Sequence, residues 1–226
     1  MTTKGLVCRD VSLSRRNAEN QEHMVLDGID AVFPAGALRV IAGPTGAGKS
    51  SLIHVLGGLL RPSSGEVIAD GKPVSRWISA HRDLWRRKVG IVFQQPHLMT
   101  RITALENIML PLVPRGRPLG EVRSLALGAL DRLGGIGLAG RTVSSLSGGE
   151  RQIISIARAV AVSPRFFLAD EPTAHQDARG LECLLRLLEE LTEERATVVV
   201  TTHDVRLKQA FPRECVSGIA NGTLMT

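Results

Sequence analysis

The sequence contains no tyrosine, and aromatic residues make up only 3% of its 226 residues. Proteins that bind single-stranded nucleic acid stack bases on aromatic side chains, so this scarcity argues against such a partner. The three cysteines, Cys8, Cys183 and Cys215, lie far apart and lack metal-site spacing. We therefore expect unpaired, buried thiols in a reducing compartment.

Long apolar runs are also missing. No stretch of about 18 apolar residues occurs, which excludes a membrane-spanning helix. Arg9 and Asp10 come too early for the apolar core of a signal peptide, and this predicts a cytosolic protein. Part of the net charge of +6 lies in residues 76–88 (RWISAHRDLWRRK). This segment is either a solvated basic face or a contact for anionic headgroups or an acidic partner; no nucleic-acid partner is expected.

The hydrophobic pattern indicates one α/β domain. Short, partly β-branched apolar runs at residues 38–42, 166–169 and 197–201 predict buried parallel strands. Helices are expected at residues 51–60 and 181–191, the second with its leucines on one side. The order strand, helix, strand over residues 166–201 is typical of a βαβ unit in a parallel sheet.

The middle of the chain differs from this pattern. Residues 103–112, 121–133 and 148–162 favour helices, with proline and glycine between the first two, and predict a helical insertion in the α/β core. Residues 6–13 and 67–69 fit an antiparallel flank.

A glycine-rich loop carries the strongest chemical signal. Residues 43–50 (GPTGAGKS) match GxxxxGK[ST], after a predicted strand and before a predicted helix. Glycines let successive N–H groups converge on a phosphate, and the helix N-terminus adds its dipole. Lys49 is expected to reach the β- and γ-phosphates, and Ser50 to supply a hydroxyl to Mg²⁺. The predicted phosphate contacts are Gly43, Pro44, Thr45, Gly46, Ala47, Gly48, Lys49, Ser50 and Ser51.

Two carboxylates follow the predicted strand at residues 166–169. The carboxyl ends of parallel strands are where ligands bind, so Asp170 and Glu171 are expected at a site. Asp170 is placed to hold Mg²⁺ through water, and Glu171 to orient or deprotonate the attacking water. Adjacent strand residues face opposite sides, so the two carboxylates can have separate roles.

Residues 146–150 (LSGGE) open a predicted helix. Ser147 has the character of an N-cap, and the glycines permit close backbone approach to an anion at the helix N-terminus. Alone, the segment fits an ordinary helix cap better than an anion site.

Taken together, the motifs resemble the ATP-binding cassette (ABC) family. LSGGE stands between a phosphate-binding loop and a strand ending in Asp-Glu, as in that family. Gln94 matches its Q-loop glutamine, Asp177 its D-loop aspartate, and His203 (in TTHD) the histidine that contacts the γ-phosphate. The resemblance implies an ATPase. Its implied catalytic residues are Glu171, His203, Lys49 and Gln94, and its implied metal ligands are Ser50, Gln94 and Asp170.

The same resemblance implies the architecture and the partners. It predicts a P-loop NTPase (RecA-like) fold with a mostly parallel sheet, an antiparallel N-terminal β flank and a helical subdomain. One domain would span residues 1–226, with the core at about 1–94 and 163–226 and the helical subdomain at about 95–162. Such cassettes pair, a homodimer here, with ATP and Mg²⁺ between them. Ser147, Gly148, Gly149 and Asp177 would then contact nucleotide held mainly by the partner.

The resemblance also implies an integral-membrane permease as partner and a position on the inner face of the cell membrane. Residues 103–112 (TALENIMLPL) are similar to lipoprotein-releasing, macrolide-exporting and cell-division cassettes, which favours an exporter or mechanical transmission. An ATP-driven signalling module without transport is the alternative. A soluble ABC ATPase fits less well, because neither a tandem cassette nor a long insertion is present.

Two departures from the family pattern stand out. Residues 170–177 are DEPTAHQD where that subgroup usually has DEPTGNLD, so coupling between paired sites can differ. Residues 14–16 (SRR) occupy the place of the usual adenine-stacking aromatic. Arg15 or Arg16 could stack its guanidinium plane on the base, or both arginines could be solvated.

Overall fold

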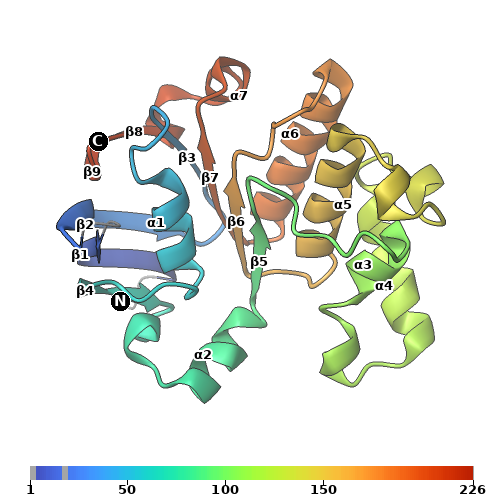
Figure 1. Cartoon of the computed structure of the whole chain (residues 1–226), viewed down its shortest axis with the longest axis horizontal. Coiled ribbons are helices and arrows are strands. Elements are labelled where there is room, and N and C mark those ends of the chain that lie inside the picture. Colours follow the sequence, from blue (N-terminus) through green and yellow to red (C-terminus); the bar gives the residue numbers. More distant parts are fainter. Residues whose placement is uncertain (1–3, 17–19, 226) are drawn as a thin grey trace.

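The computed structural model describes residues 4–16 and 20–225, which form two sheets and the helices around them (Figure 1). The larger sheet has the order β5-β6-β7-β3-β8-β9, and its neighbouring strands are parallel except for β8 and β9. Its strands are β3 (Leu38–Ala42), β5 (Val89–Val92), β6 (Phe166–Asp170), β7 (Thr197–Thr202), β8 (Val216–Ala220) and β9 (Thr223–Met225).

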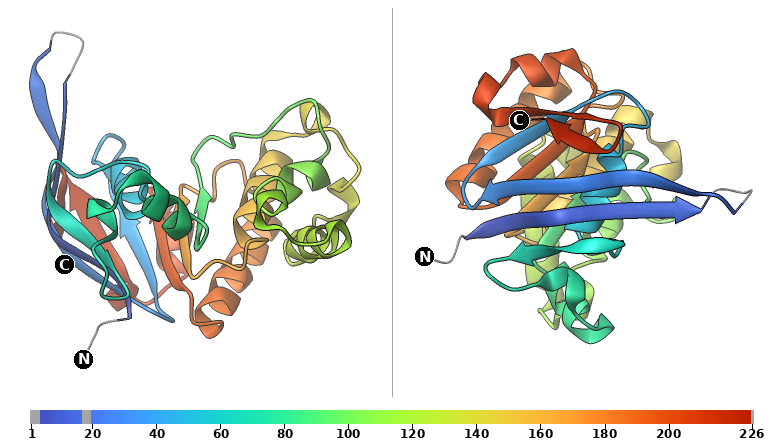
Figure 2. Two further views of the ribbon diagram at one scale, coloured as in Figure 1. Left: turned by 90° about the horizontal axis from the view of Figure 1, so that it is seen from below. Right: turned by 90° about the vertical axis from the view of Figure 1, so that its left-hand side faces the viewer.

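The smaller sheet is antiparallel, with the order β2-β1-β4. It consists of β1 (Gly5–Arg16), β2 (Glu22–Pro34) and β4 (Ser64–Ala69). Figure 2 shows β1 and β2 extending together beyond the body of the molecule. The predicted fold class, a mostly parallel sheet with an antiparallel N-terminal flank, is confirmed.

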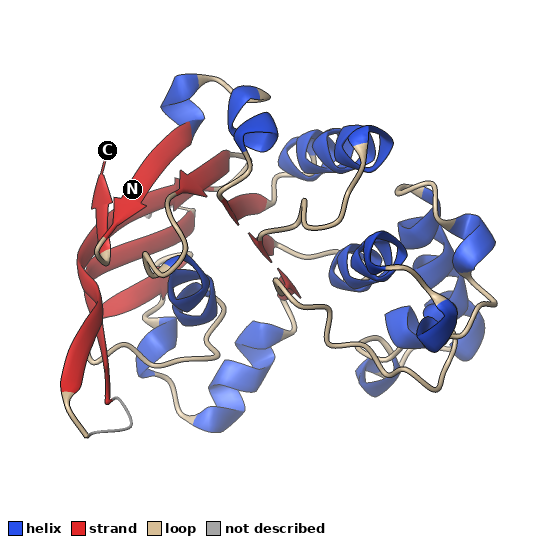
Figure 3. Cartoon of the chain, turned by 45° about the horizontal axis from the view of Figure 1, so that its top comes forward, coloured by secondary structure: helices blue, strands red, loops and turns tan. Residues whose placement is uncertain are grey.

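Helices cover both faces of the larger sheet (Figure 3). The α-helices are α1 (Lys49–Leu56), α2 (Ser79–Arg86), α3 (Ala104–Met109), α4 (Leu119–Asp131), α5 (Gly148–Val160), α6 (Ala178–Glu193) and α7 (Val205–Gln209). Short 3₁₀ turns are η1 (Val74–Arg76), η2 (Val113–Arg115), η3 (Ile136–Leu138), η4 (Val143–Ser145) and η5 (Arg213–Cys215). Within residues 4–16 and 20–225, no helix has the length and apolar composition needed to cross a membrane.

Strand β6 shows how the core is divided. Phe166 and Leu168 belong to the hydrophobic cluster shared with α1 and the antiparallel sheet. Phe167 and Ala169, which point to the opposite face, belong to the cluster shared with α3 to α6. A strand buried on both faces has the continuous apolar sequence seen at 166–169. The predicted strands at 38–42 and 197–201 are confirmed, as is the leucine face of α6.

Helix α1 is shorter than predicted. It ends at Leu56, four residues before the end expected from the sequence. Gly58 has φ +69°, and a Cβ on Gly57 would lie 2.5 Å from Ile91 Cδ1, so the chain turns away there against β5. The sequence contains the glycine pair that ends the helix. The predicted helix was longer because Leu59 and Leu60, beyond the pair, continue the apolar pattern.

The basic segment at residues 76–88 contains helix α2, which was not predicted because most of its residues are polar. Helix α2 is held by Trp85, which is 3% exposed and packs its ring against that of Phe166, with 4.5 Å between the centroids and a tilt of 57°. Arg86 donates from Nη2 to Gly58 O at 2.8 Å. Arg87 and Lys88, which follow this helix, are exposed, so the solvated basic face and the contact for an anionic partner both stay predictions.

Helices α3, α4 and α5 lie together at one end of the molecule (Figure 1). They correspond to the helical insertion expected at residues 103–162. Their apolar residues and those of one face of the larger sheet form one continuous cluster. The division into a core and a helical subdomain at residues 95 and 162 stays a prediction.

Candidate functional site

The glycine-rich loop joins β3 to α1, and its conformation depends on glycine. Gly48 caps α1 with φ +100°, in the left-handed region that favours glycine. A Cβ there would lie 2.7 Å from Val25 O, and one on Gly43 would lie 2.2 Å from Ile219 O. The loop is therefore packed against two other strands as well as being curled.

Lys49 is the first residue of α1, and its side chain folds back across the loop. Its Nζ donates to Gly43 O at 2.8 Å and to Pro44 O at 3.0 Å, and lies 3.3 Å from Glu171 Oε1. The residue is 6% exposed. A buried ammonium group held by two carbonyls and one carboxylate is ready to pair with phosphate oxygens at the same place.

Asp170 and Glu171 leave the end of β6 in different directions. Asp170 is still in the strand, and its Oδ1 accepts from Thr201 Oγ1 of β7 at 2.6 Å. Glu171 has φ +49°, the left-handed region, and its N–H donates to Thr201 O at 2.9 Å. The two carboxylates are thus separated, as predicted, but by a left-handed turn and not by strand alternation.

Glu171 makes its remaining contacts with the end of β7. Its Oε2 accepts from His203 N at 3.0 Å, and its Oε1 lies 2.8 Å from His203 Nδ1. The Glu171 side chain is 5% exposed and the His203 side chain 64% exposed. Beyond His203, the pKa of Asp204 is lowered chiefly by hydrogen bonds from Arg206, which favour the ionised carboxylate.

These residues surround a cavity of about 170 Å³. It is lined by Val25, Thr45, Gly46, Gly48, Lys49, Ser50, Ser51, Gln94, Glu171 and His203. Apart from Val25, all were predicted as site residues. Of the other predictions, Asp170 adjoins Glu171 at the strand end, and Gly43, Pro44 and Ala47 belong to the loop but do not line this cavity.

Val25 is the residue that the sequence did not reveal. It lies on β2 and reaches the loop because the β1–β2 register shifts between Leu13 and Ser14. No local pattern marks it. Arg15 is exposed on β1, is paired in register with His23, and lines neither this cavity nor the one described next. Its contact with adenine stays a prediction.

The LSGGE segment lies apart from the phosphate-binding loop. Ser147 caps α5 in a reciprocal capping box: its Oγ accepts from Glu150 N at 3.2 Å, and Glu150 Oε2 accepts from Ser147 N at 2.7 Å. The hydrogen bond from the Ser147 backbone, with help from Arg141, holds the pKa of Glu150 below its usual value. The start of α5 is therefore a helix N-terminus capped on both sides of the box.

A second cavity, of about 520 Å³, contains this helix start. Ser147, Gly149 and Asp177 line it, and Gly148 packs against the His175 ring. It shares no lining residue with the cavity at the phosphate-binding loop. The structure therefore brings the predicted site residues together in two separate groups.

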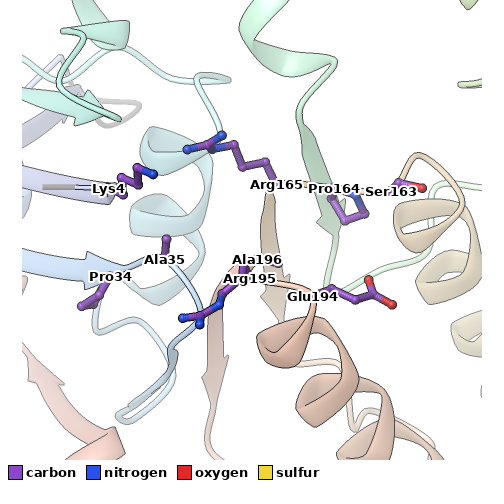
Figure 4. A pocket seen from close by; sticks show the side chains of 9 residues that line it. All are labelled: Lys4, Pro34, Ala35, Ser163, Pro164, Arg165, Glu194, Arg195 and Ala196. Carbon is purple, nitrogen blue, oxygen red and sulfur yellow. The ribbon is translucent and has the colours of Figure 1, made fainter. Parts of the chain in front are cut away.

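A larger cavity, of about 660 Å³, lies at the amino ends of β6 and β7 (Figure 4). Arg165 and Ala196, which precede β6 and β7, line it together with Lys4 and Arg195. It contains none of the predicted site residues. In open parallel sheets, ligands bind beyond the carboxyl ends of the strands, where the phosphate-binding loop lies.

Comparison with known proteins agrees with this geometry. Residues 26–174 match the family model described as "ABC transporter". The chain is 32% identical to the cassette MJ0796, described as a bacterial ABC transporter cassette in a dimeric structure, over 98% of this chain and 97% of that one, with a TM-score of 0.91. A dimeric post-hydrolysis state of MJ0796 bound to ADP and Pi matches at 31% identity, over 98% and 97% of the two chains, also with a TM-score of 0.91. Clostridium perfringens cbiO1, described as part of the transporter complex cbiONQ, is 27% identical over 99% of this chain and 88% of that one, with a TM-score of 0.81.

The chain therefore belongs to the ABC transporter family. It is an ATP-binding cassette and an ABC ATPase, as the motifs predicted.

Proposed function

We propose that the chain is the ATP-hydrolysing subunit of a membrane transporter and works as a homodimer with ATP at the interface. The observation that carries this proposal is the separation of the site residues into two groups within one chain. Lys49, Glu171 and His203 surround one cavity, and Ser147 and Gly149 line another. Two copies in opposite orientation would bring the first group of one against the second group of the other. The dimeric MJ0796 structures support this arrangement.

The residues at the phosphate-binding loop fit a Mg²⁺ ion. Ser50 and Gln94 line the same cavity, and Asp170 stands at the adjoining strand end. A hydroxyl, an amide oxygen and a carboxylate are the hard oxygen donors that Mg²⁺ prefers, with water in its other positions. Ser50, Gln94 and Asp170 would hold the ion, which would neutralise charge on the phosphate oxygens.

In the proposed hydrolysis, Glu171 orients and deprotonates a water molecule. Its carboxylate faces the cavity, is held by His203, and lies near Lys49. Lys49 neutralises charge on the phosphate oxygens, and His203, from its exposed position, contacts the γ-phosphate. Phosphoryl transfer to water depends on such positioning and charge compensation more than on covalent catalysis. The helix N-terminus at Ser147 of the second copy completes the binding of the γ-phosphate.

A groove beside Gln94 supports a permease as partner. It has a volume of about 430 Å³, and Ile91, Phe93, Leu110 and Pro111 give it an apolar floor. Arg158 also lines it, and donates from Nη1 to His97 O at 2.6 Å. Burial lowers the pKa of Arg158. An apolar groove edged by a partly desolvated guanidinium fits a short amphipathic helix of a membrane subunit.

Arg115 lines the same groove and has similar surroundings. It donates to Pro111 O at 3.1 Å and to Arg87 O at 2.7 Å, and burial lowers its pKa. Among the residues that the structure describes, neither Arg115 nor Arg158 forms a salt bridge with a carboxylate. The TALENIMLPL segment, which forms α3 and the groove rim, supports an exporter or lipoprotein-release type. The subunit would then sit on the cytoplasmic face of the membrane.

Co-purification with the membrane protein encoded beside this chain tests the partner. Wild-type protein is expected to co-purify with the tagged permease, and Leu110→Glu to lose it, because a carboxylate would enter the apolar part of the groove. Leu119→Glu is the matched control, since Leu119 is 69% exposed on α4 and lies outside the groove. Equal recovery of both variants, or no recovery of wild type, would contradict permease docking at this groove.

A further inference from the structure

The segment between Glu171 and α6 runs along the first turn of α5. A Cβ on Gly149 would lie 2.7 Å from His175 O, and one on Gly148 would lie 3.2 Å from His175 Cγ. His175 itself has φ +61°. Glycine at the start of α5 therefore lets this segment approach the helix backbone directly, and the segment connects the two groups of site residues.

The side chain of Gln176 packs between this segment and the first turn of α5. It is 9% exposed, and its Nε2 donates to Gly149 O at 3.0 Å. Its Oε1 lies 2.0 Å from where a Cβ on Gly180 would be, so the amide also fills the space left by a glycine in the first turn of α6. The Gln176 amide is thus enclosed between the N-terminal turns of two helices.

The backbone of Gln176 is tied to the other group. Its N–H donates to Thr173 O at 3.0 Å, within the turn that follows Glu171. Its carbonyl accepts from Arg206 Nη2 at 3.4 Å. Arg206 also pairs with Asp204 at 2.8 Å, next to the His203 that holds Glu171. One residue therefore contacts α5 through its side chain and the Glu171–His203 region through its backbone.

We propose that Gln176 is a positioning residue, which fixes the first turn of α5 relative to Glu171 and His203 of the same chain. This inference rests on the proposed dimer, in which that turn binds the partner's ATP while Glu171 acts on the chain's own ATP. Without the amide donor, the α5 turn loses its side-chain hydrogen bond to the segment that carries Glu171, and only the packing of Gly148 and Gly149 against His175 remains. The first turn of α5 then has to be ordered when the dimer forms, and this weakens dimerisation. ATP binding to a single subunit is unaffected.

The test uses Gln176→Met in a Glu171→Gln background, in which hydrolysis does not deplete the dimer. Methionine keeps the length and packing of glutamine but cannot donate. We expect the dimer dissociation constant in ATP and Mg²⁺, measured by analytical ultracentrifugation, to rise about 3- to 10-fold, as for the loss of one hydrogen bond. The ATP affinity of the dilute monomer, measured with a fluorescent nucleotide, is expected to change less than about twofold.

Gln209→Met is the matched control, because Gln209 is exposed at the end of α7 and lines neither cavity. It should leave both constants unchanged. Gln176→Glu extends the series, since a carboxylate facing the Gly149 carbonyl repels it and should weaken the dimer more than methionine does. With Glu171 intact, Gln176→Met should raise the protein concentration needed for half-maximal ATPase activity, with kcat at saturating protein retained.

Failure of the inference and failure of the proposed function give different results. If the Glu171→Gln protein stays monomeric in ATP, the dimer itself is wrong. If it dimerises and Gln176→Met matches the Gln209→Met control, Gln176 does not position the interface. A parallel loss of monomer ATP affinity would also overturn the inference, since it would show that Gln176 supports the fold of the whole site.

Discussion

Replacing Glu171 by glutamine tests the catalytic assignment most directly. The substitution keeps the shape of the side chain and removes its charge and basicity. In the structure the carboxylate is 5% exposed, lies 3.3 Å from Lys49 Nζ and accepts from His203 N at 3.0 Å. The glutamine amide oxygen can still accept from His203 N, so the turn after β6 should hold.

Hydrolysis should fall about 10²- to 10⁴-fold, which is the usual contribution of a positioned general base. ATP binding should survive or tighten. At an effective dielectric constant of about 20, unit charges at the observed separation of Lys49 and Glu171 attract each other by about 5 kcal/mol before desolvation is counted. Phosphate must compete with that attraction for Lys49. Release of about 1.4 kcal/mol of it would tighten ATP binding tenfold.

The assay pairs phosphate release at saturating ATP with nucleotide affinity from a fluorescent analogue. Glu182→Gln is the matched control, because Glu182 is 74% exposed on α6 and should leave both quantities unchanged. Hydrolysis within a few-fold of wild type in Glu171→Gln would show that Glu171 is not the base. Loss of ATP binding together with hydrolysis would show that its role is to hold Lys49 and the loop in place.

Other predictions concern different parts of the chain. Lys49→Ala should weaken ATP binding about 10- to 100-fold, the loss of charge-assisted hydrogen bonds, as measured by nucleotide titration; unchanged affinity would contradict the phosphate contact. Burial raises the pKa of Cys8 to about 12, so Cys8 should resist alkylation at pH 8 until the protein is unfolded, as peptide mass spectrometry can check. The pKa of Glu150 is lowered from 4.5 by its bond to Ser147 N, so its stabilisation is present above pH 4.5 and lost as pH falls below it. The Tm difference between wild type and Glu150→Gln should therefore shrink from pH 7 to pH 3.5, and a constant difference would refute the linkage.

The sequence predicted those parts of the site that are formed by residues adjacent to one another in the chain. The loop at residues 43–50 and the strand that ends in Asp170 are local patterns, and the structure places both where expected. Val25 could not be predicted, since its position depends on a register shift between two strands. The Gln176–Gly149 contact joins residues 27 apart through a turn that no local pattern specifies. Helix α2 was missed because a single buried tryptophan holds a segment of mostly polar residues.

The left-handed backbone conformation of Glu171 determines where its carboxylate points. A non-glycine residue in the left-handed region costs roughly 1–3 kcal/mol and persists only where its surroundings enforce it. Here the Glu171 N–H donates to Thr201 O of β7, and its carboxylate accepts from the N–H of His203, which follows β7, so the conformation is enforced at both ends of the residue. The resulting turn directs Glu171 into the cavity while Asp170 stays in the strand, bonded to Thr201 Oγ1. Two adjacent carboxylates can therefore take the separate roles of metal binding and water activation because the chain bends between them.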